Sequence, residues 1–184
     1  MSVVNFDVTY VENRNRLTVF FRAVLQIPHA LLVGVWGYAN NLAGVIHWFI
    51  QVFTGKRNAG ISTFSQNYLH YQARVSAYGG LLYDVYPNFG SERGQEPTMY
   101  QLDMTPDVNR VTVLFRIIVA IPAFIVAFLY GIGSLVCTIL SWFSIVVTGK
   151  MPRGLFDFIL KAQQYTARLG AYMALLTDVY PSVA

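Results

Sequence analysis

The chain has 184 residues, a formal net charge of +4, an apolar fraction of 55% and a charged fraction of only 12%. Soluble domains carry about twice that share of charged residues, so this composition points to contact with lipid. Nucleic-acid binding requires basic residues clustered along one face, whereas here they flank apolar runs, as membrane anchors do. We therefore expect no nucleic-acid partner.

Two long apolar runs, residues 23–55 and 117–149, contain no Asp, Glu, Lys or Arg. Eighteen or more apolar residues form a candidate membrane span, because the hydrocarbon layer is about 30 Å thick. Each run has 33 residues and would be about 50 Å long as one helix, which is long for one crossing and short for two. The amino terminus lacks a basic region followed by an apolar core, so we expect these internal runs, not a cleavable signal, to direct targeting.

The chain contains an internal repeat. A shift of 94 positions aligns residues 15–87 with residues 109–181 without a gap, and 28 of the 73 aligned positions are identical. The identities include polar and turn residues, which a shared lipid environment does not explain. We interpret the chain as a tandem duplication.

Each copy begins with the same local signals. Alternating apolar residues at 4–8 and 99–104 predict a short strand. Asn15 and Asn109 stand where an N-cap belongs, ahead of the first helix. The apolar segments 17–26 and 111–120 then lead to Ile-Pro, where the missing backbone donor predicts a kink or a new helix.

The long runs then pass a weak point at Gly37 and Gly131. Basic residues stand before and after each run, and such flanks favour the cytoplasmic side. A hairpin that turns near these glycines returns both flanks to one face and keeps the copies parallel, although its second arm is shorter than a full span. The alternative is one tilted crossing per copy, preceded by an interfacial helix.

Apolar residues at steps of three and four predict an amphipathic helix after each run. Its apolar stripe comprises Ile61, Phe64, Tyr68, Tyr71, Val75, Tyr78 and Leu82, or Leu155, Phe158, Ala162, Tyr165, Leu169, Tyr172 and Leu176. The opposite side is polar, so we expect this helix at the membrane interface. The predicted fold is mainly α and integral to the membrane. It has membrane repeats at 1–87 and 98–184, joined by a polar linker at 88–97. Each repeat comprises a strand, a hairpin broken near the Ile-Pro and the glycine, and this interfacial helix.

Cations at the ends of the apolar runs are candidates for binding lipid headgroups. They are Arg22, Lys56, Arg57, Arg116, Lys150 and Arg153. Arg22 and Arg116 stand in apolar surroundings, where a charge marks a functional site, but each can also snorkel to the headgroups. We favour snorkelling, because neither apolar run contains an acidic residue to pair with them.

His29 and His47 are candidate ligands of a haem or a pigment, since an intramembrane histidine can serve that role. The second copy has Ala123 and Ser141 there, and such a histidine more often bonds a neighbouring helix. Cys137 is the only cysteine and has no ligand set around it. We recognise no catalytic constellation or metal-ligand spacing, so we expect neither enzymatic activity nor a cofactor.

The ordered motifs of both copies resemble a known family. Ile27-Pro28-His29, then Phe53-Thr54-Gly55-Lys56, then Gly154-Leu155-Phe156-Asp157-Phe158 and a closing Thr177-Asp178-Val179-Tyr180-Pro181 carry the resemblance. The pattern is similar to domain of unknown function 4389, and the likeness covers nearly the whole chain. It implies a bacterial integral membrane protein of the cytoplasmic membrane, and it implies no activity.

Three functional hypotheses follow. The first is a non-enzymatic accessory or scaffold subunit of a larger membrane complex, for example an energy-converting one, with other integral subunits and lipids as partners. Small residues in the apolar runs would permit close helix packing. The second is a lipid-binding or membrane-shaping hairpin protein. The third is a subunit that carries a haem or a pigment.

Overall fold

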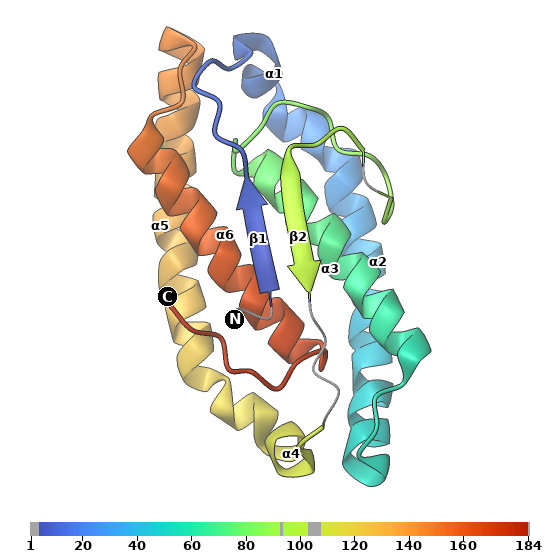
Figure 1. The fold of residues 1–184 in the computed structure, drawn as a ribbon. Coiled ribbons are helices and arrows are strands. Elements are labelled where there is room, and N and C mark those ends of the chain that lie inside the picture. Colours follow the sequence, from blue (N-terminus) through green and yellow to red (C-terminus); the bar gives the residue numbers. More distant parts are fainter. Residues whose placement is uncertain (1–3, 93, 103–107, 184) are drawn as a thin grey trace.

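The computed structural model describes residues 4–92, 94–102 and 108–183, and Figure 1 shows its fold. The described chain is mainly helical, as the sequence predicts. Its elements in chain order are β1 (Val4–Val8), α1 (Arg16–Phe20), α2 (Arg22–Thr54), α3 (Ala59–Gly79), β2 (Thr98–Leu102), α4 (Arg110–Val119), α5 (Ile121–Thr148) and α6 (Arg153–Met173).

The two predicted strands form, and they pair with each other. β1 and β2 make an antiparallel two-stranded ribbon in which Val4 lies opposite Leu102 and Val8 lies opposite Thr98. Alternate residues of β1 are buried, and the remaining two, Asn5 and Asp7, are exposed. The pairing of a strand of one copy with a strand of the other was not predicted from the sequence. Residues 103 and 104 of the predicted second strand lie outside the described residues.

The elements form three layers (Figure 1). The ribbon lies on one side and contacts α6 through β1 and α3 through β2. Helices α3 and α6 cross in the middle layer, with α2 packed on α3 and α5 packed on α6. The long helices α2 and α5 therefore form the side of the molecule that faces away from the ribbon, and they run in opposite directions.

The two copies exchange their first helices. Helix α1 of the first copy packs on α5 of the second, and α4 of the second packs on α2 of the first. The indole Nε1 of Trp48 donates to the carbonyl of Val113 at 2.9 Å, and that of Trp142 donates to the carbonyl of Val19 at 3.1 Å. This arrangement corrects the expectation of parallel copies, because an approximate twofold relation brings the start of each copy to the end of the other's long helix.

The predicted starts of the first helices are confirmed. The side chain of Asn15 accepts hydrogen bonds from two backbone N–H groups of α1, and Asn109 does the same for α4. The predicted break at Ile-Pro is confirmed in the second copy, where Pro122 occupies the first turn of α5. In the first copy the helix breaks at Phe21 instead, and Pro28 lies inside α2.

The predicted turn at Gly37 and Gly131 is wrong. Helices α2 and α5 continue through both residues, and each ends at a glycine with a left-handed backbone, Gly55 with φ of 69° and Gly149 with φ of 78°. Helix packing explains the glycine at position 37, because a Cβ there would lie 2.9 Å from the Tyr68 hydroxyl. The hairpins of this fold are therefore α2 with α3 and α5 with α6.

The expected interfacial position of α3 and α6 also needs correction. Their apolar stripes form as predicted and pack on the long helices, but the ribbon and the described part of segment 88–97 cover their polar sides. Gln164 donates to the carbonyl of Phe6 in β1, and Arg74 is only 3% exposed. Both helices thus lie between two layers of the protein.

The polar linker is held in place by one buried ion pair. Arg74 of α3 lies 3.4 Å from the carboxylate of Glu96, and it also donates to the carbonyls of Glu92 and Gly90. The same carboxylate accepts the backbone N–H groups of Asn88 and Gly94. Burial raises the pKa of Glu96, but these hydrogen bonds and the nearby guanidinium lower it more, so the net pKa lies below 4.5.

Candidate functional site

Helix α2 has inverted amphipathic character. Its outward residues are large and apolar, and Leu31, Val35 and Leu42 are 67%, 71% and 69% exposed. Its buried residues are polar: Arg22, His29, Asn40, His47 and Gln51. In a water-soluble helix the apolar stripe faces the core. Polar groups that face the protein interior, with apolar groups outside, are the arrangement required in lipid.

Helix α5 extends this apolar surface. Its exposed residues recur at helical spacing from Ile121 to Val147, and its most apolar window of 18 residues has a mean hydropathy of 2.3 with 6% of it buried. Among the described residues, this one helix is long and apolar enough to cross a membrane by length and composition. In the part of the chain that the structure describes, 40 large apolar side chains are exposed, and 30 of them lie on α1, α2, α4 and α5. We call this surface the apolar face.

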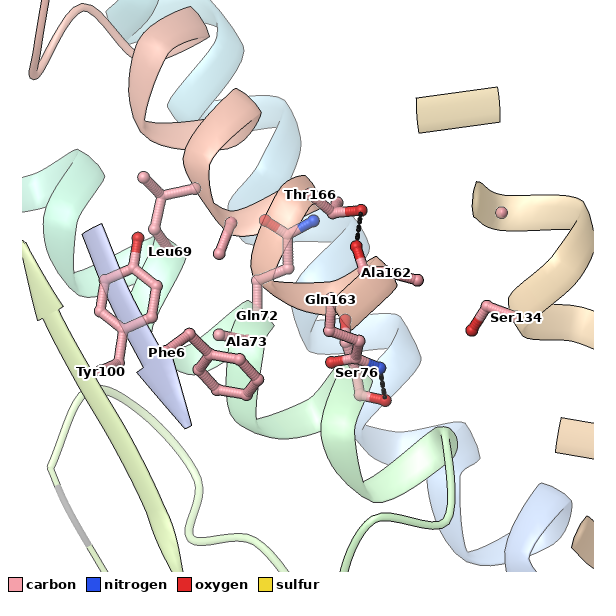
Figure 2. A pocket seen from close by; sticks show the side chains of 12 residues that line it. Phe6, Leu69, Gln72, Ala73, Ser76, Tyr100, Ser134, Ala162, Gln163 and Thr166 are labelled. Carbon is pink, nitrogen blue, oxygen red and sulfur yellow. Dashed lines mark hydrogen bonds between the residues drawn. The ribbon is translucent and has the colours of Figure 1, made fainter. Parts of the chain in front are cut away.

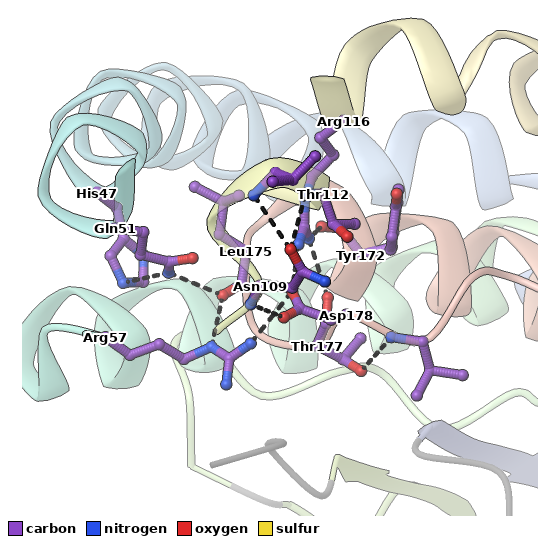
Figure 3. A network of polar contacts seen from close by, with 12 residues as sticks. His47, Gln51, Arg57, Asn109, Thr112, Arg116, Tyr172, Leu175, Thr177 and Asp178 are labelled. Atoms are coloured by element: carbon purple, nitrogen blue, oxygen red, sulfur yellow. Dashed lines mark hydrogen bonds and ion pairs between the residues drawn. The ribbon is translucent and has the colours of Figure 1, made fainter. Parts of the chain in front are cut away.

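Arg22 and Arg116 do not reach out to headgroups. They are 3% and 2% exposed, and each pairs with an aspartate that follows the amphipathic helix of its own copy. Arg22 lies 2.7 Å from Asp84, and Arg116 pairs in the same way with Asp178 (Figure 3). This finding corrects the snorkelling expectation, since the partner comes from outside the apolar run.

Each of these arginines holds together three parts of its copy. Arg116 donates to the carbonyl of Tyr172 in the last turn of α6 and to that of Thr177 beyond the helix, and the guanidinium lies 4.4 Å from the centre of the Tyr172 ring. The other oxygen of Asp178 accepts the backbone N–H of Asn109, the N-cap of α4. This role of the aspartates was not predicted from the sequence. A signal for the pairing was present in the sequence, because the Arg and the Asp are both identical in the two copies.

The remaining predicted cations divide into two groups. Arg57 bonds to the carbonyl of Leu175 and lies 3.4 Å from Asp178 (Figure 3). Lys56 is exposed. The side chains of Lys150 and Arg153 are 61% and 64% exposed and form ion pairs on the surface. Lys56, Lys150 and Arg153 are therefore the predicted cations that remain accessible to headgroups.

His29 and His47 are not brought together. Both are fully buried on α2, and 18 residues of helix separate them by about 27 Å. Nδ1 of His29 lies 2.6 Å from the Tyr71 hydroxyl, and Nε2 of His47 lies 2.8 Å from the Gln51 amide. Each ring thus bonds a neighbouring side chain. No group of three or more potential metal ligands lies among the described residues.

A groove opens at the apolar face between α2, α4 and α6, and we call it the large groove. It has a volume of about 660 Å³. Gly44, Val45, Trp48 and Phe49 of α2 form one wall, and Ile117 of α4 and Met173 of α6 lie on the other. Asn40, Asn41 and Gln72 are the uncharged polar residues of its lining.

The approximate twofold relation places a second, smaller groove between α2, α3 and α5. We call it the small groove. Its volume is about 270 Å³, and Trp142 takes the place of Trp48 in its wall. Gln26 is the counterpart of Ala120 in the other copy, and its side chain lies over Gly79. A Cβ built at Gly79 would lie 2.4 Å from the nitrogen of the Gln26 amide. The side chain of Gln26 is therefore one of the groups that narrow this groove.

A third cavity of about 230 Å³ lies deeper, beneath the ribbon (Figure 2). Phe6 and Tyr100 of the strands line it on one side and Gln163 of α6 on another, and Gln163 donates to the carbonyl of Ser76 at 2.7 Å. Leu69 and Gln72 line both this cavity and the large groove. These two residues of α3 therefore border both spaces.

The family model described as "Domain of unknown function (DUF4389)" matches the chain twice, over residues 16–91 and 110–184. The chain belongs to this family, in two tandem copies. A search of curated proteins and a search of solved structures each found no match.

Proposed function

We propose that this member of the family is a non-enzymatic membrane protein that lies within one leaflet of a bilayer, where it binds and rearranges lipids. The observation that carries the proposal is the apolar face backed by buried polar residues. Its helices would contact acyl chains, and the ribbon with segment 88–97 would face water. Burial of each large apolar side chain stabilises such an arrangement by about 1.5–3 kcal/mol.

The length of the apolar face supports helices that lie along the membrane plane. Exposed apolar residues of α2 run from Val24 to Phe53, about 44 Å of helix, whereas the hydrocarbon layer is about 30 Å thick. A helix that crosses the bilayer would extend well beyond the hydrocarbon unless it were strongly tilted. A helix in the plane keeps the whole stripe at one depth.

The ribbon gives an independent argument. It lies alongside the middle of the long helices, so a crossing orientation would place it in the hydrocarbon (Figure 1). Each strand of a two-stranded ribbon has one edge outside the ladder, and open edges are not tolerated in lipid. Asn5, Asp7 and Gln101 are also exposed there. In-plane insertion leaves the edges and these side chains in water.

The exposed cations agree with this orientation. Arg16 and Lys150 lie at one end of the long helices, where Arg16 approaches Gly149, and Lys56 and Arg110 lie at the other. With the helices in the plane, all four stand at headgroup level on the same side of the membrane. The basic flanks then share one face, as the positive-inside pattern favours.

Depth measurements along α5 test the proposal. In a Cys137→Ser background, single spin labels at positions 125, 132, 139 and 147 would be read by oxygen and nickel accessibility in liposomes. The in-plane orientation predicts similar depths at all four, with a water-accessible control at Asp7. A depth that is greatest at 132 and 139 and shallow at both ends would show a crossing helix and overturn the proposal.

A shape assay tests the lipid-rearranging part. Insertion into one leaflet expands that leaflet, so reconstitution at increasing protein density should reduce vesicle diameter or produce tubules. Electron microscopy would measure the diameter. Vesicles of unchanged shape and lipid order, with the protein inserted, would contradict this part.

A second candidate is the accessory subunit of a larger membrane complex. Gly34 and Gly131 favour it, because both are exposed on the apolar face and an added Cβ at either meets nothing within 4 Å. Such positions admit the close approach of another helix. Mild-detergent purification should then recover a larger partner from the wild type but not from Gly34→Leu or Gly131→Leu. A monomer from the wild type would argue against this candidate.

A further inference from the structure

We infer that the large groove binds one uncharged lipid whose head carries a free hydroxyl group, of the diacylglycerol class. The inference rests on the proposed function, since the ligand would enter sideways from the leaflet. Val45, Phe49 and Ile117 line the groove and are 57%, 50% and 69% exposed, so the groove opens onto the apolar face. Its volume of about 660 Å³ lies in the range of small-molecule sites.

The buried amide of Asn40 points to a hydroxyl group in the ligand. Asn40 lines the groove and is 8% exposed, and its buried side-chain oxygen has no hydrogen-bond partner. An unsatisfied buried acceptor costs about 1–3 kcal/mol, so the site favours a ligand that donates to it. A hydroxyl donates one hydrogen bond and can also accept one from an amide such as that of Gln72.

The charges of the lining favour an uncharged head over a phosphate. Arg116 is the one cation among the lining residues, and Asp178 already neutralises it. Its two terminal nitrogens are engaged, because Nη1 donates to the carbonyls of Tyr172 and Thr177 and Nη2 donates to Asp178. A phosphate would enter a partly buried site without a free cation, which is costly. The apolar walls, by contrast, match acyl chains.

Trp48 provides a built-in reporter of occupancy. It lies in the wall of the large groove, so a brominated acyl chain bound there would quench its fluorescence. The probe would be dioleoylglycerol with brominated chains, added to the full chain in detergent with Trp36→Phe and Trp142→Phe. We expect saturable quenching with one lipid per protein. The O-methyl ether of the same lipid should bind about tenfold more weakly, and brominated phosphatidylglycerol no better than the ether.

Two substitutions complete the test. Gly44→Phe should abolish saturable quenching, because the ring would fill open space in the groove, whereas Gly34→Phe on the same helix lies outside the lining and should leave it unchanged. Asn40→Leu should remove the preference for the free hydroxyl while chain binding persists. Circular dichroism would verify the fold of each variant.

The outcomes separate this inference from the proposed function. No saturable quenching in wild type, equal affinity for the ether, or equal loss in Gly44→Phe and Gly34→Phe would overturn the groove assignment. Tighter binding of phosphatidylglycerol would assign the groove to anionic lipids instead and also overturn it. The depth profile along α5 would be unaffected by any of these results, and only that profile decides the in-plane orientation.

Discussion

The large and small grooves show how two copies of one sequence unit have diverged. Both lie beside a buried Arg–Asp pair and a wall tryptophan, and both end at a leucine with positive φ, Leu175 or Leu81. They differ in several lining side chains: Gln26 lies over Gly79 where the other copy has Ala120 and Met173, and Thr138 stands where the large groove has Gly44. The duplication kept the framework and changed access to it.

The ion pairs provide the largest test of this comparison. Arg22→Met leaves Asp84 without the guanidinium at 2.7 Å, while Arg116→Met leaves Asp178 with Arg57 at 3.4 Å. Loss of one partner of a buried pair costs about 3–5 kcal/mol. Because Asp84 is partly exposed, we expect Arg22→Met to lower the free energy of unfolding by about 3 kcal/mol. We expect about 2 kcal/mol for Arg116→Met. Denaturant unfolding in detergent would measure both.

Arg57 supplies the control for the ion-pair comparison. Removal of Arg57 together with Arg116 should bring the loss up to that of Arg22→Met, because Asp178 then lacks both cations. If Arg116→Met alone destabilised the protein more than Arg22→Met, the compensation by Arg57 would be ruled out.

A pH dependence should distinguish the first copy from the second. Arg74 pairs with Glu96, whereas its equivalent Arg168 donates to the carbonyl of Ser182. Because the folded state lowers the pKa of Glu96 below 4.5, this carboxylate stabilises the fold above its unfolded pKa. That contribution is lost as the pH falls through the folded pKa. Glu96→Gln should cost about 1–3 kcal/mol at neutral pH.

The measurement for Glu96 is unfolding of wild type and Glu96→Gln across the acid range. The difference between them should shrink as the pH drops below 4.5. A difference that stayed constant would show that the carboxylate charge is not responsible.

The glycines that end α2 and α5 should differ less in their effect on stability. Gly55→Ala and Gly149→Ala both place a Cβ at positive φ, which costs about 1–2 kcal/mol. The added Cβ at Gly55 would lie 2.6 Å from Nε of Arg110, against 3.0 Å from Nε of Arg16 at Gly149. We expect the Gly55 variant to have the lower free energy of unfolding by thermal or denaturant melts. Equal values would show that the arginines move aside without cost.

The smallest expected change in stability comes from Gln26→Ala, below about 1 kcal/mol. The substitution should instead enlarge the small groove, because it removes the side chain that lies over Gly79. In protein with Trp142 as the single tryptophan, we expect new quenching by the brominated lipid. The free hydroxyl should give no advantage there, because Ser134, the counterpart of Asn40, is not among the residues that line the small groove. An unchanged signal would mean that another side chain closes this groove.

Local signals in the sequence predicted the local structure well. The repeat, the helix caps at Asn15 and Asn109, both short strands and the amphipathic stripes are confirmed. Each depends on neighbouring residues or on a direct comparison of the copies. The family resemblance rested on motifs of the same kind.

Long-range packing explains what the sequence did not predict. A glycine in an apolar run is compatible with a turn or with close helix contact, and only the position of Tyr68 against Gly37 decides between them. Likewise, Asp84 is 62 residues from Arg22, so the pair becomes visible only when α3 folds back along α2. The grooves depend on the exchange of α1 and α4, which no local pattern encodes.

That exchange has a consequence for the origin of the chain. The ribbon ladder and both indole bonds to Val19 and Val113 join one copy to the other. A shorter polypeptide with a single unit could satisfy these bonds only by associating with an identical molecule. Gene fusion would then have tethered the subunits of a symmetric homodimer, and the freedom of each half to vary would explain why one groove is wider than the other.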